Sequence, residues 1–211
     1  QKGKDASYYK TQIAFHFLRI LDFKFAQNVD QFICNSQTTK ARIQKFYRKQ
    51  AIVINPPIDL PQDVSKPSLD HSNFPPRHSG RNKSSFFLTG GRLARAKRYD
   101  IAIKAANKTK IPLRIFGRDF AGHQAELKDI ANSNVRFLGE ISQSQKAKLM
   151  SQARGFIFCS DNEDFGMVPV EAMAYGCPVI AYKSGGVIET VIDGKTGLFF
   201  DELKPDSCIK A

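Results

Sequence analysis

Beyond residue 85, hydrophobic and polar positions alternate in a way that predicts short strands and helices in turn. Apolar segments of five to seven residues recur there, separated by segments with apolar residues three and four positions apart. The expected strands are residues 86–90, 111–117, 135–139, 155–160, 177–182 and 196–200, and the expected helices are residues 99–108, 123–132, 142–153, 169–176 and 186–193. This alternation predicts an α/β fold with a Rossmann-like, doubly wound parallel sheet.

The first part of the chain predicts the end of a second, similar domain. Apolar residues recur every fourth position within residues 8–27, so we expect a helix there that packs on a sheet. A strand, a helix with Ser36 as its N-cap and another strand follow. Such a unit needs a larger sheet to join. We therefore expect residues 1–60 to be the tail of a Rossmann-like domain. Residues 61–84, rich in proline and serine, are expected to form a linker or exposed insert before a domain at residues 85–211.

Charge is unevenly distributed along the chain. The net charge is +12; residues 1–150 carry 27 Lys and Arg against 11 Asp and Glu (+16), and residues 151–211 carry 5 against 9 (−4). A basic surface suits nucleic acid, an anionic membrane face or a phosphorylated small molecule. Charge alone does not choose among them.

Apolar runs and cysteine spacing both favour a cytoplasmic protein. No apolar run approaches the roughly 18 residues of a spanning helix, and the first residues lack the apolar core of a signal peptide. The four cysteines show no CxxC or Cys/His spacing, so we expect small buried side chains in a reducing compartment.

The loop after the strand at residues 86–90 carries candidate anion-binding groups, because ligands bind beyond the carboxyl ends of parallel strands. In TGGRLARAKRYD, Gly91 lets the backbone approach a ligand, while Arg92 and Lys97 offer a planar fork and a point charge to one diphosphate. The alternative is an ordinary basic turn. The segment is neither a Walker loop nor a GxGxxG motif.

The segment EDFGMVPVEAMAYG carries candidate hydroxyl acceptors. Gly166 frees the turn before a helix whose first amides, including those of Met167 and Val168, can hold an anion or a hydroxyl. Glu163 precedes this helix and Glu171 lies in its opening turns, so both can face one cleft. The alternative makes Glu163 a solvated acid and Glu171 a favourable charge at the positive helix end, worth about 0.3–1 kcal/mol.

Two further loops carry weaker signals. Arg136, in VRFLGEIS, is available to a planar base or to solvent. Gly185 and Gly186, in SGGVIET, either approach a ligand or form a tight turn.

Taken in order, these segments resemble the retaining glycosyltransferases of family 4, which have the two-domain GT-B fold. The resemblance covers nearly the whole chain, and its most specific element is the pair of glutamates separated by seven residues. It implies that Glu163 lies by the donor sugar and that Glu171 binds the nucleotide ribose. It also implies that Arg92 and Lys97 hold the diphosphate, while the backbone from Phe165 to Val168 holds sugar hydroxyls and phosphate.

The expected catalytic residues are therefore Glu163, Arg92 and Lys97, and the expected donor-binding residues are Glu171, Gly91, Gly117, Arg136, Phe165, Gly166, Met167 and Val168. Carboxylates accept hydroxyls and phosphates need cations, so an acidic loop facing a basic loop is complementary to a nucleotide diphosphate sugar. The two cations would replace a metal ion at the departing diphosphate, so we expect neither a metal nor a cofactor.

The resemblance implies retaining transfer of a hexose from a nucleotide diphosphate sugar to a glycan or lipid-linked acceptor. The segments KRYDIAI and NPPID favour mannosyltransferase-like members and hence GDP-mannose, with UDP-sugars left open. Basic residues before residue 60 fit peripheral contact with an anionic membrane face.

The chain departs from the family pattern in two ways. Arg98 stands where a glycine often follows the lysine that matches Lys97. The resemblance also implies that most of the N-terminal acceptor domain and part of the closing C-terminal helix lie outside these 211 residues. We therefore expect the 211 residues to hold mainly the donor site and to be inactive in transfer on their own.

Two other functions are weighed against this one. A nucleic-acid-binding module would suit the basic charge, but no helix-turn-helix, RNP or zinc pattern supports it, so no nucleic acid is expected. A GT-B epimerase or non-catalytic homologue would hold a nucleotide sugar without transferring it.

Overall fold

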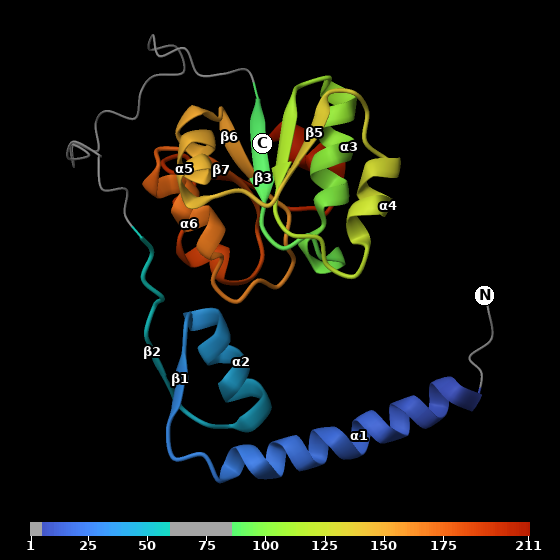
Figure 1. Ribbon diagram of the computed structural model, residues 1–211. Helices are drawn as coiled ribbons and strands as arrows, with labels where there is room; N and C mark the ends of the chain where they lie inside the picture. The colour runs from blue at the N-terminus through green and yellow to red at the C-terminus, as the bar shows by residue number, and fades with distance from the viewer. Residues whose placement is uncertain (1–5, 60–85) are drawn as a thin grey trace. The chain divides into compact units, whose positions relative to one another are not determined.

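The computed structural model describes residues 6–59 and 86–211 and divides the chain into two compact units (Figure 1). The first unit ends at Asn55 and the second begins at Pro56. The smaller unit contains α1 (Ala6–Gln27), β1 (Phe32–Cys34), α2 (Gln37–Tyr47) and β2 (Ala51–Val53). Its two strands are parallel, and the hydroxyl of Ser36 accepts a hydrogen bond from the Thr39 amide as the predicted N-cap of α2.

Helix α1 differs from its prediction in its packing. The apolar side chains of the predicted face are exposed, with Ile13 at 59% and Phe25 at 68%, and within the described residues of its own unit the helix packs against α2 and not against the two-stranded sheet. Its contacts within the unit lie in its last turns, where the Tyr47 hydroxyl donates to Asp22 over 2.9 Å. Apolar residues in fact occur on all sides of α1, so one sheet face could not cover them. In the residues that the structure describes, no helix is long and apolar enough to cross a bilayer.

The larger unit is a six-stranded parallel sheet in the order β5-β4-β3-β6-β7-β8. Its strands are β3 (Phe87–Gly90), β4 (Leu113–Phe116), β5 (Val135–Gly139), β6 (Gly155–Phe158), β7 (Val179–Tyr182) and β8 (Gly197–Phe200). The helices are α3 (Tyr99–Thr109), α4 (His123–Asp129), α5 (Gln143–Gln152), α6 (Met167–Ala174) and α7 (Pro205–Lys210), with short 3-10 helices η1 (Arg95–Lys97) and η2 (Gly185–Glu189). Each predicted strand is present, and the helix predicted at residues 186–193 is the short η2 instead.

Alternate residues of the strands face two separate cores, one on each side of the sheet. Leu88 and Phe156 pack with Met150 of α5 and Ala172 of α6. Ile115 packs on the opposite side, in the core that α3, α4 and α7 cover. Figure 1 shows α5 and α6 on one side of the larger unit and α3 and α4 on the other. The predicted doubly wound α/β class is confirmed.

The chain reverses its direction of winding between β3 and β6. It runs outward from β3 through β4 to β5, and then returns to place β6 on the other side of β3. The backbones of β3 and β6 pair only over their first two residues, and the Thr89 hydroxyl then donates to the Ile157 carbonyl over 2.7 Å. The loops that follow these two strands therefore leave in opposite directions, and in such sheets ligands bind in the crevice at this reversal.

Candidate functional site

The loops after β3 and β4 meet through two glycines at the carboxyl end of the sheet. Gly91 and Gly117 have φ angles of +125° and +133°. A methyl group on Gly117 would lie 1.7 Å from the Gly91 carbonyl oxygen. The Gly117 amide also donates to the Gly139 carbonyl over 2.7 Å. The close approach of the two backbones therefore requires a glycine at position 117, and the positive φ favours one at position 91.

The loop after β6 presents Glu163 to the loop after β3. The Ser160 hydroxyl, itself buried, donates to Glu163 Oε2 over 2.8 Å. The ammonium of Lys97 forms an ion pair with the same carboxylate oxygen. The side chains of Lys97 and Glu163 are 23% and 22% exposed, so the pair is partly shielded from water. One cation and one anion thus span the crevice where the winding reverses.

The loop after β7, which contains Gly185 and Gly186, packs against the loop that carries Glu163. The Gly186 amide donates to the Glu163 carbonyl over 2.7 Å. A methyl group on Gly185 would lie 2.2 Å from the same carbonyl oxygen, and one on Gly186 would lie 2.2 Å from the Asp164 carbonyl oxygen. Both glycines thus pack against protein backbone at the tight turn that begins η2.

Arg92 lies beside the crevice as an exposed cation. Its guanidinium lies over the Phe120 ring, 5.2 Å from the centroid. The Tyr99 hydroxyl donates to the Arg92 carbonyl over 3.4 Å, and burial raises the pKa of Tyr99, which keeps this hydroxyl protonated. Within residues 6–59 and 86–211, no carboxylate pairs with the Arg92 side chain. Its charge is available to an anion.

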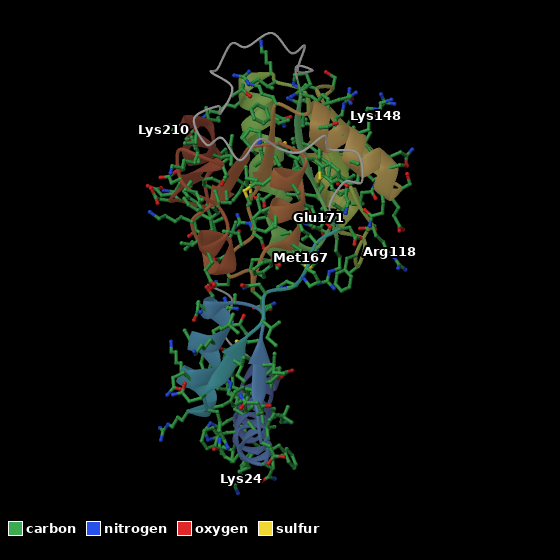
Figure 2. The ribbon with its side chains drawn as sticks, turned by 90° about the vertical axis from the view of Figure 1, so that its left-hand side faces the viewer. Lys24, Arg118, Lys148, Met167, Glu171 and Lys210 are labelled. Carbon is green, nitrogen blue, oxygen red and sulfur yellow. The ribbon has the colours of Figure 1, made fainter. Side chains whose placement is uncertain are left out.

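Helix α6 brings its N-terminus and Glu171 to the same end of the sheet. Its N-cap is Gly166, at φ +87°, and Figure 2 shows Met167 at one end of α6 with Glu171 further along. A methyl group on Gly91 would lie 3.9 Å from a methyl carbon of Val168, so this N-terminus adjoins the basic loop. First-turn amides of a helix lack intrahelical acceptors and attract anions.

Glu171 is itself paired. The ammonium of Lys146, on α5, donates to Glu171 Oε2 over 2.8 Å. The two side chains are 15% and 21% exposed. Lys146 follows a turn of α5 that is fixed by a capping box between Ser142 and Gln145. Sequence reasoning missed Lys146, because nothing distinguishes it from Lys148 on the same helix.

The remaining predicted residues lie in different places. Phe165 is buried, so only its backbone is available to a ligand. Arg136 is the second residue of β5 and lies three residues before the carboxyl end of the strand, so the structure does not bring it to the other candidates. Ser160 was also missed, although it is the last residue of a predicted strand and precedes the acidic run.

Arg98 occupies a backbone conformation that explains why a glycine is common there. Its φ of 51° and ψ of 41° are left-handed, and the residue joins η1 to α3. Its guanidinium bonds to Asp100 over 3.0 Å. This ion pair holds the corner directly after Lys97 without a glycine.

Sequence comparisons identify the family of the chain. The family described as glycosyl transferases group 1 matches residues 71–211. An uncharacterized glycosyltransferase of Methanocaldococcus jannaschii is 30% identical over 97% of this chain and 54% of its own length. The alpha-1,3/1,6-mannosyltransferase ALG2 of Dictyostelium discoideum is 31% identical over 80% of this chain and 48% of its own length. The chain spans about half the length of these curated relatives.

Solved structures share the fold. Sucrose-phosphate synthase of Thermosynechococcus elongatus superimposes with a TM-score of 0.74 at 25% identity, over 92% of this chain and 50% of its own. Anabaena HepE, in complex with UDP and glucose, gives a TM-score of 0.70 at 24% identity, over 86% of this chain and 52% of its own. The expected likeness to GT-B glycosyltransferases is confirmed, and the chain belongs to the family of glycosyl transferases group 1.

Proposed function

We propose that the crevice between the loops after β3 and β6 binds the nucleotide sugar donor of a retaining, metal-independent hexosyltransferase. The observation that carries the proposal is the ion pair between Lys97 and Glu163 across the winding reversal. A cation and a hydroxyl acceptor at one point match a ligand in which a diphosphate joins a sugar.

Donor binding would exchange the partners of both groups. Lys97 would turn from Glu163 to the diphosphate, where Arg92 supplies a second positive charge. The carboxylate of Glu163, still held by the Ser160 hydroxyl, would then accept hydroxyls of the sugar. Cations placed where the departing diphosphate gains charge lower the barrier to cleavage of the sugar–phosphate bond.

The remaining donor contacts follow from α6 and the glycine loops. Glu171 would accept the ribose hydroxyls, and the amides of Met167 and Val168 would bind phosphate or sugar at the helix N-terminus. The bare backbone of Gly91 and Gly117 lets the donor approach the ends of β3 and β4. The Arg136 side chain is also proposed to contact the base, and this proposal rests on the sequence alone.

The transferred sugar is proposed to be mannose, from GDP-mannose, and the acceptor a glycan or a lipid-linked glycan. The support is the similarity to ALG2 mannosyltransferases, seen also at 29% identity over 80% of this chain for the human protein. Transfer with GDP-mannose and a lipid-linked oligosaccharide, followed by NMR of the new anomeric centre, tests both the sugar and retention. An inverted product would contradict retention, and exclusive use of a UDP-sugar would contradict GDP-mannose as the donor.

Donor binding is tested by calorimetric titration of the chain with GDP, UDP and ADP in EDTA. We expect one nucleotide to bind without metal, and Glu171→Gln to weaken it about tenfold through loss of a charged acceptor. Glu202→Gln, which changes an exposed glutamate that pairs with Lys204, is the matched control. Absence of binding, or equal effects of the two substitutions, would overturn the assignment.

We also propose that the protein is cytoplasmic and contacts an anionic membrane face. The support is the basic composition of the first 60 residues, together with a lipid-linked acceptor. Sedimentation with vesicles containing 30% or less anionic lipid, at about 50 mM salt, tests the contact. Equal sedimentation with neutral vesicles would rule out the electrostatic origin.

A further inference from the structure

We infer that Lys146 is a positioning residue that holds the Glu171 carboxylate in the orientation that accepts the ribose. This inference rests on the proposed donor site and adds to it a residue from a different helix. Lys146 lies outside the loops that carry the other candidate groups, and it contacts the site through Glu171.

The contact has the geometry of a specific brace. The ammonium lies 2.8 Å from one carboxylate oxygen, and both side chains are largely shielded from solvent. A charged hydrogen bond that water cannot easily replace is stronger than an exposed ion pair. In the part of the chain that the structure describes, Lys146 is the one side chain bonded to Glu171.

The brace leaves the carboxylate free to bind a ligand. A carboxylate has about four acceptor positions, of which the ammonium takes one on Oε2. Oε1 and the second position of Oε2 remain for two neighbouring hydroxyls. The ammonium can therefore stay in place when ribose binds, unlike that of Lys97, which the diphosphate would draw away.

The position of Lys146 along α5 is also fixed. The Ser142 hydroxyl accepts from the Gln145 amide and the Gln145 side chain accepts from the Ser142 amide, which closes the first turn. The Lys146 amide donates to the Ser142 carbonyl over 2.9 Å. An acceptor held in one orientation before binding loses less conformational freedom when the ribose arrives, which increases affinity.

The experiment compares Lys146→Met, Lys146→Arg and Lys148→Met. Methionine keeps the apolar stem and removes the charge, and arginine restores it. Lys148 is an exposed lysine on the same helix and serves as the matched control (Figure 2). Each variant of the full 211-residue chain is titrated with UDP, GDP and their 2′,3′-dideoxy analogues, and circular dichroism confirms its folding.

We expect Lys146→Met to weaken the ribonucleotide about tenfold and to leave the dideoxy analogue within about twofold of wild type. Lys146→Arg should recover most of the affinity, and Lys148→Met should match wild type. A general loss of structure would weaken both nucleotides alike, and that result overturns the inference. So does unchanged discrimination between ribonucleotide and dideoxynucleotide in Lys146→Met. Failure of wild type to bind any nucleotide overturns the proposed function itself, so the two failures are distinguishable.

Discussion

The two glutamates of the candidate site each pair with a lysine, and we expect only one of these lysines to change its partner when a donor binds. Glu163 pairs with Lys97 between two loops, and Glu171 pairs with Lys146 between two helices. Both pairs are similarly shielded, so burial does not distinguish them. In the proposed donor complex, the first lysine would turn to the diphosphate, while the second would stay on its carboxylate. Similar ion pairs can therefore serve in one place as an exchangeable contact and in another as a permanent brace.

The largest expected effect comes from Gly117, which packs against the loop that carries Lys97 of the first pair. Gly117→Ala should lower the free energy of unfolding by about 3 kcal/mol or more, because the methyl group would collide with the Gly91 carbonyl at a positive φ. Urea denaturation measures the loss. Gly122→Ala is the control, since its φ is +73° but no atom lies within 4 Å of the added methyl group. It should cost about 1 kcal/mol. Equal costs would show that the close approach is not limiting.

Removing Lys97, the lysine of the first pair, should weaken the binding of the phosphates and leave the binding of the ribose unchanged. Lys97→Met is expected to weaken a nucleoside diphosphate about 10- to 100-fold, and the nucleoside monophosphate by about threefold at most. Calorimetric titration of both ligands measures the difference, and Lys195→Met, at an exposed lysine, is the control. If Lys97→Met instead lost the discrimination between ribonucleotide and dideoxynucleotide, the two ion pairs would not have separate roles.

The hydroxyl that holds Glu163 sharpens the comparison further, because among the described residues Glu171 bonds to the ammonium alone. Ser160→Ala should reduce stability by about 1 kcal/mol through loss of a buried hydrogen bond. Ser151→Ala removes an exposed serine that bonds to the Lys148 carbonyl, and should change stability by less than about 0.5 kcal/mol. Thermal denaturation of both variants tests this. If Ser160→Ala is as stable as wild type, Lys97 alone holds the carboxylate.

The smallest expected effect is a dependence of stability on pH. The corner after Lys97 is held by the ion pair between Arg98 and Asp100, whereas the turn before Lys146 is held by the uncharged capping box of Ser142 and Gln145. Burial alone would raise the pKa of Asp100, but its hydrogen bond to Arg98 and the charges of Arg98 and Lys104 lower it below the ordinary value. A lowered pKa gives stability that is present above the unfolded pKa, near 3.8, and is lost as pH falls through the folded value.

Asp100→Asn should therefore cost about 0.5–1 kcal/mol at pH 7 and progressively less below about pH 4. Ser142→Ala, in the capping box before Lys146, should cost about 1 kcal/mol at every pH. Urea denaturation at a series of pH values compares them. A constant cost for Asp100→Asn would show that its charge is not what holds the Arg98 corner.

Sequence predicted those features that depend on neighbours along the chain. The strands, the Ser36 cap and the turn at Gly166 follow from local apolar runs, hydroxyl capping and glycine conformation, and each is present. The spacing of Glu163 and Glu171 also predicted that both lie on one segment at the carboxyl end of the sheet.

Features that depend on contacts between distant segments could not be predicted in this way. Lys146 meets Glu171 only because α5 and α6 cover the same face of the sheet. Gly185 and Gly186 pack against the backbone of Glu163 and Asp164, since what lies against a glycine is set by the tertiary fold. The residue type of Arg136 suggested a contact with a ligand. Whether its side chain lies near the carboxyl end of β5 depends on where that strand ends.

Helix α1 has a consequence for the colloidal behaviour of the chain. Its exposed apolar side chains, among them Phe17 and Phe25, form a surface that attracts other apolar surfaces in water. The high positive charge opposes such association at low ionic strength, and added salt screens that repulsion. Salt would therefore weaken the repulsion between chains while leaving the attraction of α1 in place, so the second virial coefficient should become more negative as ionic strength rises.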